Sequence, residues 1–321
     1  MNVNVELLIQ HGNDVFIPAV QEGITWTTER KGVPGELQFK VINDGTLNIS
    51  EGDAVRMKMN GSNVFYGFIF ELKRDKEQII SVLAYDQLRY LKNKDTYVYE
   101  GKTASEFIRM IANDFNLQVG NLENTGFKIA SRVEENTSLF DMIQTALDLT
   151  LENQSKLYVM YDDFGKITLK SLESMQLNVL IDAETGENFD YSSSINDKTY
   201  NQIKLTYDNE KTGKREVYIA KHGQNINSWG VLQYFDTLKE GENGQAKADA
   251  LLKLYNAKTR NLTIKKAFGD VRVRAGSMIV VQLDLGDKKV QNLMLVEKCK
   301  HEFSESQHFM DLSLRGGEFI A

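Results

Sequence analysis

The sequence predicts an α+β chain that is mainly β, with strand-rich regions at both ends and a smaller α/β part between them. Short runs at both ends alternate apolar and polar residues, which is the period of half-buried strands. Near residue 100 the period changes to that of amphipathic helices. At 321 residues the chain also exceeds the length of about 250–300 residues above which one core usually splits into several.

Residues 1–94 are expected to form the first β domain. ELQFKVI alternates Leu37, Phe39 and Val41 with polar partners, and VRMKM repeats this pattern from Val55. FIFELK and IISVLAY then predict a hairpin across the turn RDKEQ. Several short strands with frequent turns are typical of a small barrel or a sandwich.

Residues 95–175 are expected to form an α/β module. Thr103 and Glu106 have the spacing of a capping box at the start of an amphipathic helix. A second helix is predicted to begin at Thr137 or Ser138. The run LYVMYDDFGKITLKSL then predicts a hairpin that turns at DFG.

Residues 176–262 are expected to contain a linker, strands and one long helix. NQIKLTY and REVYIAK predict two strands, and the helix begins at Gln245. Residues 263–321 predict the closing strands of a second β region. In both β regions a glycine, Gly52 or Gly276, precedes a strand that leads to a hairpin. Such an echo indicates a duplication, although any all-β region can produce similar runs.

Composition excludes several function classes. The net charge of −7, without clustered Lys and Arg, argues against specific nucleic-acid binding or attachment to a membrane surface. No apolar run approaches the ~18 residues that span a bilayer, and we expect no secretion signal. The single Cys299 excludes an internal disulfide and a cysteine-based zinc cluster, and we expect a buried thiol on a strand.

Three fragments resemble catalytic motifs but lack the required partners. GKT at 101–103 lacks the glycine of a phosphate-binding loop, and DFG at 163–165 has no kinase context. His301 and Glu302 lack the second histidine of a zinc protease. His301 and His308 flank the last hairpin loop and could meet, but we expect solvated strand-end histidines. We therefore predict no catalytic residue, no metal site and no cofactor.

Several aromatic residues are candidates for partner contacts. Phe65, Tyr66 and Phe68 lie so close together that one must face outward from its strand. Trp229 and Tyr234 are expected in a β or loop context. Surface aromatic residues often anchor partner contacts. The alternative, that each seals one end of a β domain, stays open.

Four segments carry a resemblance to a known family. They are AYDQLRYLKN, residues 97–117, residues 136–173, and the part from YNQIKLTYD through WGVLQYF to LSLRGG. In this order they resemble the XkdQ/YqbQ family, which comprises baseplate hub proteins of contractile phage tails and phage-tail-like particles. This family is distantly similar to the late control protein D and VgrG hubs. The resemblance covers nearly the whole chain and preserves order and spacing.

The resemblance implies a tail-hub fold with two related small β-barrels and inserted or appended α/β modules. It also implies a homotrimeric ring that joins a six-fold tail tube protein to a three-fold spike protein. A baseplate wedge or LysM-type neighbour and the tape-measure protein are further possible partners. Such a subunit assembles in the bacterial cytoplasm and leaves by lysis within the particle.

On this interpretation the barrel hairpins carry the interfaces. The candidate residues are Phe65, Tyr66 and Phe68 in the first hairpin and Met294, Phe303 and Phe309 in the last. The family offers no catalytic residue to transfer, so the chain is expected not to be an enzyme. The alternative function is a tail-associated cell-wall (murein) hydrolase that uses carboxylates of the central module. A third interpretation, a VgrG-like effector carrier, would predict a C-terminal spike repeat.

Overall fold

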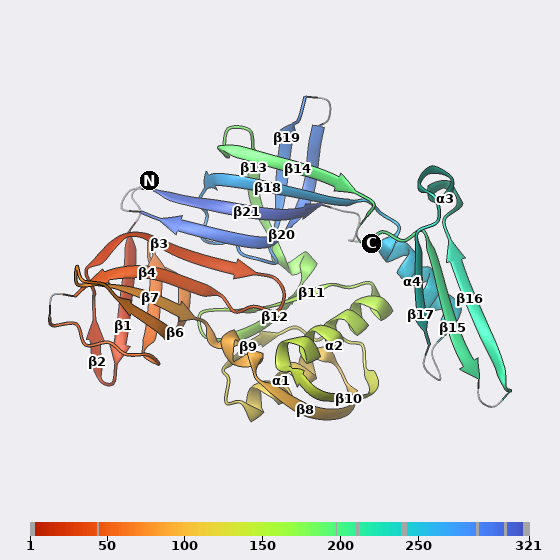
Figure 1. The fold of residues 1–321 in the computed structure, drawn as a ribbon, viewed down its shortest axis with the longest axis horizontal. Coiled ribbons are helices and arrows are strands. Elements are labelled where there is room, and N and C mark those ends of the chain that lie inside the picture. Colours follow the sequence, from red (N-terminus) through yellow and green to blue (C-terminus); the bar gives the residue numbers. More distant parts are fainter. Residues whose placement is uncertain are drawn as a thin grey trace.

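The computed structural model describes residues 4–43, 45–196, 198–209, 212–238, 243–286, 289–304 and 307–316. The chain is mainly β, as predicted, and has three visible parts (Figure 1). A large curved sheet contains strands from both ends of the chain, an α/β module packs beside it, and a smaller sheet with two helices, α3 (Gly223–Trp229) and α4 (Gly244–Tyr255), lies at the far end. None of the helices in the described ranges is both long and apolar enough to cross a membrane.

The large sheet contains 13 strands, drawn from both ends of the chain. The N-terminal half contributes β1 (Val5–His11), β2 (Asp14–Phe16), β3 (Val20–Glu29), β4 (Glu36–Ile42), β5 (Ala54–Met59), β6 (Ser62–Arg74) and β7 (Ile79–Tyr85). The C-terminal half contributes β13 (Gln176–Asp182), β14 (Asn188–Ser194), β18 (Thr259–Phe268), β19 (Met278–Asp284), β20 (Lys289–Phe303) and β21 (His308–Gly316).

The two halves have the same strand order. The N-terminal half is arranged β3-β4-β7-β6-β5-β1, and the C-terminal half is arranged β14-β18-β21-β20-β19-β13. Strands in the same place in the two lists also follow one another in the same order along the chain. One pairing differs, because β1 runs antiparallel to β5 whereas β13 runs parallel to β19. The halves are therefore equivalent in topology for six strands each.

The correspondence extends to single hydrogen bonds before the equivalent strands β5 and β19. The amide of Gly52 donates to the carbonyl of Ile69 at 2.8 Å, and that of Gly276 donates to the carbonyl of Val296 at the same 2.8 Å. The two glycines have φ of +93° and +94°, which is a conformation that side chains disfavour. The repeated sequence pattern, a glycine before a strand that leads to a hairpin, thus corresponds to one repeated local geometry.

Directly after these bonds, both long strands bulge. The pairing of β6 with β7 shifts register between Ile69 and Glu71, and the pairing of β20 with β21 shifts between Val296 and Lys298. Phe70 and Glu297 are therefore the equivalent extra residues. A bulge bends its strand and increases the local twist. Beyond the bulge β6 thus turns away from β5, and β20 turns away from β19.

The bend lets β20 join the two halves. Its first part pairs with β19, and its second part, Lys298–Phe303, pairs with Glu29–Ile24 of β3. Beside this joint the Arg30 guanidinium donates two hydrogen bonds to the Glu297 carboxylate, at 2.7 and 2.9 Å. The described strands of the large sheet consequently form one open path from β14 to β2, from which β19 and β13 branch at β20. The expected closure of each half into a barrel is not confirmed.

Each half of the sheet has its own apolar core. The N-terminal core gathers the inward residues of β1, β3, β4, β5, β6 and β7, and it also contains Phe303 of β20. The C-terminal core is formed around β18, β19, β20 and β21 and includes Cys299. Since Phe303 belongs to the core of the opposite half, apolar burial as well as strand pairing holds the halves together.

The α/β module matches its predicted elements. The capping box forms, since Thr103 accepts from the Glu106 amide and Glu106 accepts from the Thr103 amide. The second helix begins directly after Ser138, which caps it. The module's elements are η1 (Gln87–Lys92), β8 (Lys94–Lys102), α1 (Ala104–Asp114), β9 (Val119–Leu122), β10 (Ile129–Ser138), α2 (Leu139–Gln154), β11 (Tyr158–Asp162), β12 (Ile167–Ser171) and η2 (Leu172–Met175).

The remaining unit is inserted between β14 and β18. Its strands pair in the order β16-β15-β17, and helix α4 packs on them through the buried Ala248 and Leu251. Trp229 is the last residue of the short helix α3, so the expectation of a β or loop context is wrong for this residue. The elements are β15 (Gln202–Asn209), β16 (Lys214–Lys221), α3 (Gly223–Trp229), β17 (Gln233–Thr237) and α4 (Gly244–Tyr255).

The two equivalent glycines offer a matched stability test. A Cβ at Gly276 would overlap the Val159 side chain of β11, whereas a Cβ at Gly52 meets nothing. We expect Gly52→Ala to lower the free energy of unfolding by about 1–3 kcal/mol through backbone strain alone. Gly276→Ala adds an overpacking cost of about 1–3 kcal/mol. Urea unfolding of both variants measures the difference, and equal losses would contradict the assigned contact.

Candidate functional site

Three of the predicted interface residues lie inside the chain. Phe65, Met294 and Phe303 are each exposed by no more than 2%. Phe303 fills the N-terminal core and stacks on His308, with 4.4 Å between ring centroids. Their burial leaves no side-chain surface for a partner, so the structure corrects these three positions to core residues.

Tyr66 and Phe68 remain half-buried on β6. Their rings contact each other at 5.8 Å between centroids, and Tyr66 also contacts Phe164 of the DFG turn at 5.9 Å. Phe68 lies 6.3 Å from Tyr90 of η1. The α/β module therefore covers part of this aromatic group, and only its outer side faces solvent.

The other predicted aromatic residues are divided between the inserted unit and the main sheet. Tyr234 stacks on Tyr255 of α4 with 5.8 Å between centroids, inside the inserted unit. Trp229 lies beneath the ammonium of Lys258 at 5.7 Å. On the main sheet the half-buried Phe309 stacks at 6.4 Å on Phe268, which the sequence reading missed although it is 63% exposed. The structure thus distributes these candidates over different surfaces and does not join them into one patch.

The two histidines of the last hairpin meet, but they are not solvated. Nδ1 of His301 lies 2.8 Å from Nε2 of His308, and the two side chains belong to residues exposed by 0% and 8%. Since Nε2 of His301 lies 2.8 Å from the Val273 carbonyl, this nitrogen donates and its Nδ1 accepts. The expectation of solvated histidines is wrong, because β3 covers the hairpin and places Trp26 4.8 Å from the His301 ring.

Burial keeps this histidine pair neutral. It lowers the pKa of His301 to about 3, with a further contribution from His308, and it lowers the pKa of His308 to about 4. Cys299 is buried on β20, as expected, and this burial raises the pKa of its thiol. Among the described residues there is no group of three or more side chains able to hold a metal ion.

Two buried carboxylates lie where the α/β module meets both halves of the sheet. Asp86 accepts hydrogen bonds from the amides of Gly35 at 2.8 Å and Leu88 at 3.0 Å. Asp162 accepts from the Gly165 amide at 2.7 Å, and burial raises the pKa of this carboxyl to about 6. Burial and the neighbouring Asp162 also raise the pKa of Asp86.

These carboxylates anchor turns. Arg274 connects them to the C-terminal half, since its guanidinium donates to the Asp162 carbonyl at 2.8 Å and stacks on Tyr161 at 4.1 Å. Both Asp86 oxygens and one Asp162 oxygen accept from backbone amides, and the other Asp162 oxygen accepts from the Gln87 side-chain amide at 3.1 Å. Hydrolysis of a glycosidic bond instead requires carboxyl groups that reach a substrate. The geometry assigns Asp86 and Asp162 a structural role.

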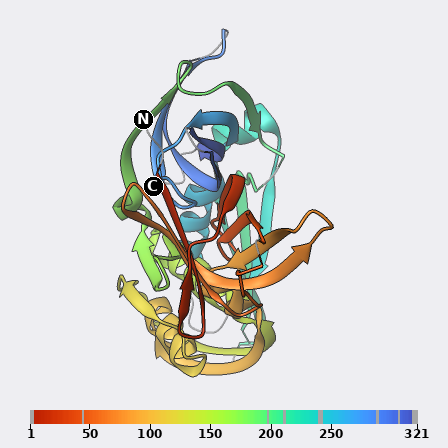
Figure 2. The same ribbon diagram turned by 90° about the vertical axis from the view of Figure 1, so that its left-hand side faces the viewer.

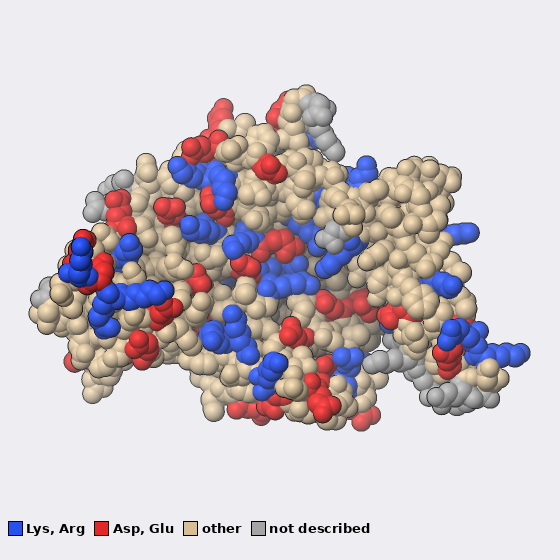
Figure 3. Space-filling view, viewed as in Figure 1, with Lys and Arg blue, Asp and Glu red and all other residues tan. Residues whose placement is uncertain are grey.

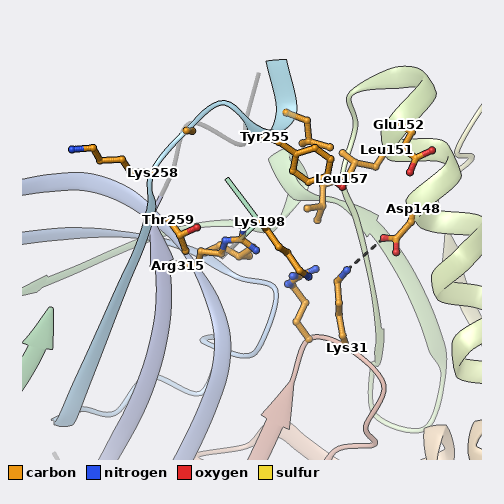
Figure 4. Close-up of a pocket in the computed structure, with 15 residues that line it drawn as sticks. Lys31, Asp148, Leu151, Glu152, Leu157, Lys198, Tyr255, Lys258, Thr259 and Arg315 are labelled. Carbon is orange, nitrogen blue, oxygen red and sulfur yellow. Dashed lines mark hydrogen bonds and ion pairs between the residues drawn. The ribbon is translucent and has the colours of Figure 1, made fainter. Parts of the chain in front are cut away.

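A basic pocket lies between the α/β module and the C-terminal half. Lys31 points into it and approaches Asp148 of α2 at 3.4 Å, and Lys198 and Arg315 line its opposite side (Figure 4). Burial lowers the pKa of Lys31. Figure 3 shows Lys and Arg gathered near the middle of this face, beside a band of acidic residues. Charges of both signs thus meet across this boundary.

Two strand edges in the large sheet have no partner among the described strands. One belongs to β6, the equivalent of β20, and the other to β14, the equivalent of β3. Beyond its bulge, the segment Glu71–Arg74 of β6 pairs with β7 on one side and with no described strand on the other. β14 likewise pairs with β18 alone among the described strands. Figure 2 shows the β6–β7 hairpin extending away from the body of the molecule. Such edges are able to accept a strand from another chain.

The neutral histidine pair predicts a pH dependence of stability. An unfolded histidine titrates near pH 6.5, so the unfolded chain binds more protons than the folded chain as the pH falls from about 6.5 towards 4. Stability therefore decreases through this window, by about 2 kcal/mol for His301 at pH 5. Urea unfolding at pH 7 and pH 5 measures the loss. The His301→Gln variant should lose less between these pH values, and an equal loss would contradict the assignment.

Comparisons with known proteins were consistent with this fold. Residues 24–315 match the family model described as YQBQ-like. The chain is 32% identical over 313 residues to the uncharacterized protein YqbQ of Bacillus subtilis, and 93% of each chain is covered. It is 31% identical over 312 residues to the phage-like element PBSX protein XkdQ of the same organism, again with 93% of each chain covered.

The fold is also found in a solved structure of distant sequence. The 43 kDa tail protein of prophage MuSo2 from Shewanella oneidensis superposes with a TM-score of 0.70 at 11% identity, covering 96% of this chain and 98% of that one. At this identity the likeness shows a shared fold. The family match over nearly the whole described length and the two relatives above 30% identity show that this chain belongs to the YQBQ-like family.

Proposed function

We propose that this chain is the structural hub subunit of a contractile-tail baseplate, in an infectious phage or a tail-like particle. In this proposal three chains form a ring that adapts a six-fold tail tube to a three-fold central spike. The observation that carries it is the repeated strand order of the two halves, with the same glycine contact in each. Three chains with two equivalent halves present six similar units to a hexameric partner, while the ring remains a true trimer.

The two halves would act as the pair of small β-barrels implied by the family resemblance. One face of the ring would contact the tail tube protein and the other the trimeric spike protein. A baseplate wedge or LysM-type protein and the tape-measure protein are further proposed partners. Among the residues selected from the sequence, Tyr66, Phe68, Trp229, Tyr234 and Phe309 remain proposed contacts, because part of each side chain is exposed.

The proposed role is not enzymatic. The hub would act through strand pairing and through burial of side chains at its contacts with other subunits. Asp86 and Asp162, which bind the amides of turns, support a role without catalysis. The relative XkdQ belongs to a phage-like element, which supports a place in a tail particle. The subunit would assemble in the bacterial cytoplasm and leave the cell within the particle after lysis.

The first prediction from this proposal concerns mass. Light scattering of the purified chain, alone and mixed with a candidate trimeric spike protein, should give a species of three times the 36.5 kDa chain mass. Heterologous contacts between like subunits close into a ring at a fixed number, so the association should stop at the trimer without higher oligomers. A monomer under both conditions would contradict the hub.

The second prediction concerns the hydrolase alternative. The purified chain should leave cell walls intact in a zymogram at neutral pH and at pH 6, because the raised pKa of Asp162 belongs to a carboxyl bound to a turn amide. A known murein hydrolase in the next lane controls for the substrate. Clearing by this chain that persists in an Asp162→Asn variant would place the activity elsewhere, and any clearing would contradict a purely structural role.

A further inference from the structure

The internal joint between the two halves specifies how neighbouring subunits meet. Resting on the trimer proposed above, we infer that the free edge of β6 in one chain pairs antiparallel with the free edge of β14 in a second copy. The register is the one that β20 and β3 use within the chain. Leu72 then lies opposite Ser193 of the second copy, and Arg74 lies opposite its Tyr191.

The first step equates β6 with β20. Ile69 and Val296 each accept a hydrogen bond from the glycine before the preceding strand, and each is followed by a one-residue bulge. Counting onward from these two residues makes Leu72 equivalent to Cys299 and Lys73 equivalent to Lys300. The segment of β20 that binds β3 therefore corresponds to the segment of β6 whose outer edge pairs with no described strand.

The second step equates β3 with β14 through rows of neighbours across the sheet. In each half a row runs from the outermost strand, through two strands, to the residue beside the bulge. The N-terminal row is Trp26, Leu37, Ala84 and Ile69, and the C-terminal row is Tyr191, Leu262, Leu314 and Val296. Trp26 is therefore equivalent to Tyr191.

The third step transfers the internal register. Within the chain, Lys300 pairs with Thr27 and His301 pairs with Trp26. The equivalent pairs between two copies are Lys73 with Ser192 and Arg74 with Tyr191. The internal joint uses the edge of β20 and the edge of β3. Among the described strands, each chain therefore has one equivalent edge of each, on β6 and on β14, for contacts with its neighbours. Contacts of this kind are heterologous and close into a ring when the rotation allows it.

The side chains at the two free edges suit a joint that forms after folding. Arg74 opposite Tyr191 can replace the stacked pair of His301 and Trp26 with a cation–π contact. Phe189, which corresponds to the buried Ile24, is 39% exposed in the single chain and would be covered. The remaining β14 positions Ser192 to Ser194 are small and polar, which limits pairing of the free edge with unrelated strands.

Engineered cysteines test this register. The double variant Lys73→Cys with Ser192→Cys places one thiol on each edge, at two residues that are exposed in the single chain. Opposite residues on antiparallel strands lie about 4.5–5.5 Å apart between Cα atoms, which is within reach of a disulfide. Mild oxidation should give covalent dimers and closed trimers on a non-reducing gel, and a reductant should return them to monomers.

Three controls use the same chain. Thr27→Cys with Lys300→Cys carries the equivalent pair inside one chain and should form an internal disulfide, seen by mass as the loss of two free thiols among three. Lys73→Cys with Asn188→Cys shifts the second thiol by four residues along β14, about 13 Å, and should crosslink at least roughly tenfold less. Each single variant tests random collision.

The outcomes separate this inference from the proposed function. Internal crosslinking together with inter-chain trimers supports the transferred register. A trimer by light scattering whose Lys73–Ser192 pair crosslinks no better than the shifted pair contradicts the joint and leaves the hub standing. A monomer, alone and with the spike protein, contradicts both.

Discussion

The architecture depends on the shared use of strand β20 by two parts of the sheet. This strand is 15 residues long, and neither partner covers its whole edge. β19 pairs with it up to the bulge at Glu297, and β3 pairs with it beyond that point. Because the strand bends at the bulge, the chain replaces one partner with another, and the Arg30 amide donates to the Glu297 carbonyl at 3.0 Å where the partners change.

The same bend in β6 has a different environment. Beyond Phe70 the inner edge pairs with β7 and the outer edge meets no described strand, and the residues there include Lys73 and Arg74. At the internal joint the corresponding positions are occupied by Lys300 and the buried His301, under Trp26. The same bulge thus precedes a buried, neutral histidine under Trp26 at the internal joint and the exposed, charged Arg74 in β6. Apolar burial suits a permanent contact, whereas charges suit an edge that must stay soluble before assembly.

Local chemistry made much of the fold predictable from the sequence. The capping box of Thr103 and Glu106 involves neighbours only, and the hairpin at DFG follows from alternation on both sides of a turn. The helix that ends at Trp229 was missed because seven residues without apolar periodicity give no helical signal. Its cap, where His222 accepts from the Asn225 amide at 3.3 Å, is visible only in three dimensions.

The candidate site was less predictable, because distant partners decide which face of a strand is buried. Alternation shows that the side chains of Phe65 and Met294 each point to one of the two faces of their strands. Only the packed sheet shows that this face is buried in the core. His301 was expected at the surface, and β3, far away in the sequence, covers it. The bulge at Glu297 carries no sequence signal of its own. The strand register past it, and hence the open edge of β6, required the structure.

The inserted unit between β14 and β18 is closed at its base. The Thr199 hydroxyl donates to the Ala257 carbonyl at 2.9 Å, and the Tyr200 amide donates to the Tyr255 carbonyl at 3.1 Å, so the incoming and outgoing chain lie side by side. The large sheet is therefore connected to the inserted unit through two chain segments that lie side by side, and this connection does not depend on the fold of the residues between them. The position is suited to evolutionary exchange of whole domains, and the same site offers a place to graft a foreign domain whose termini are close together.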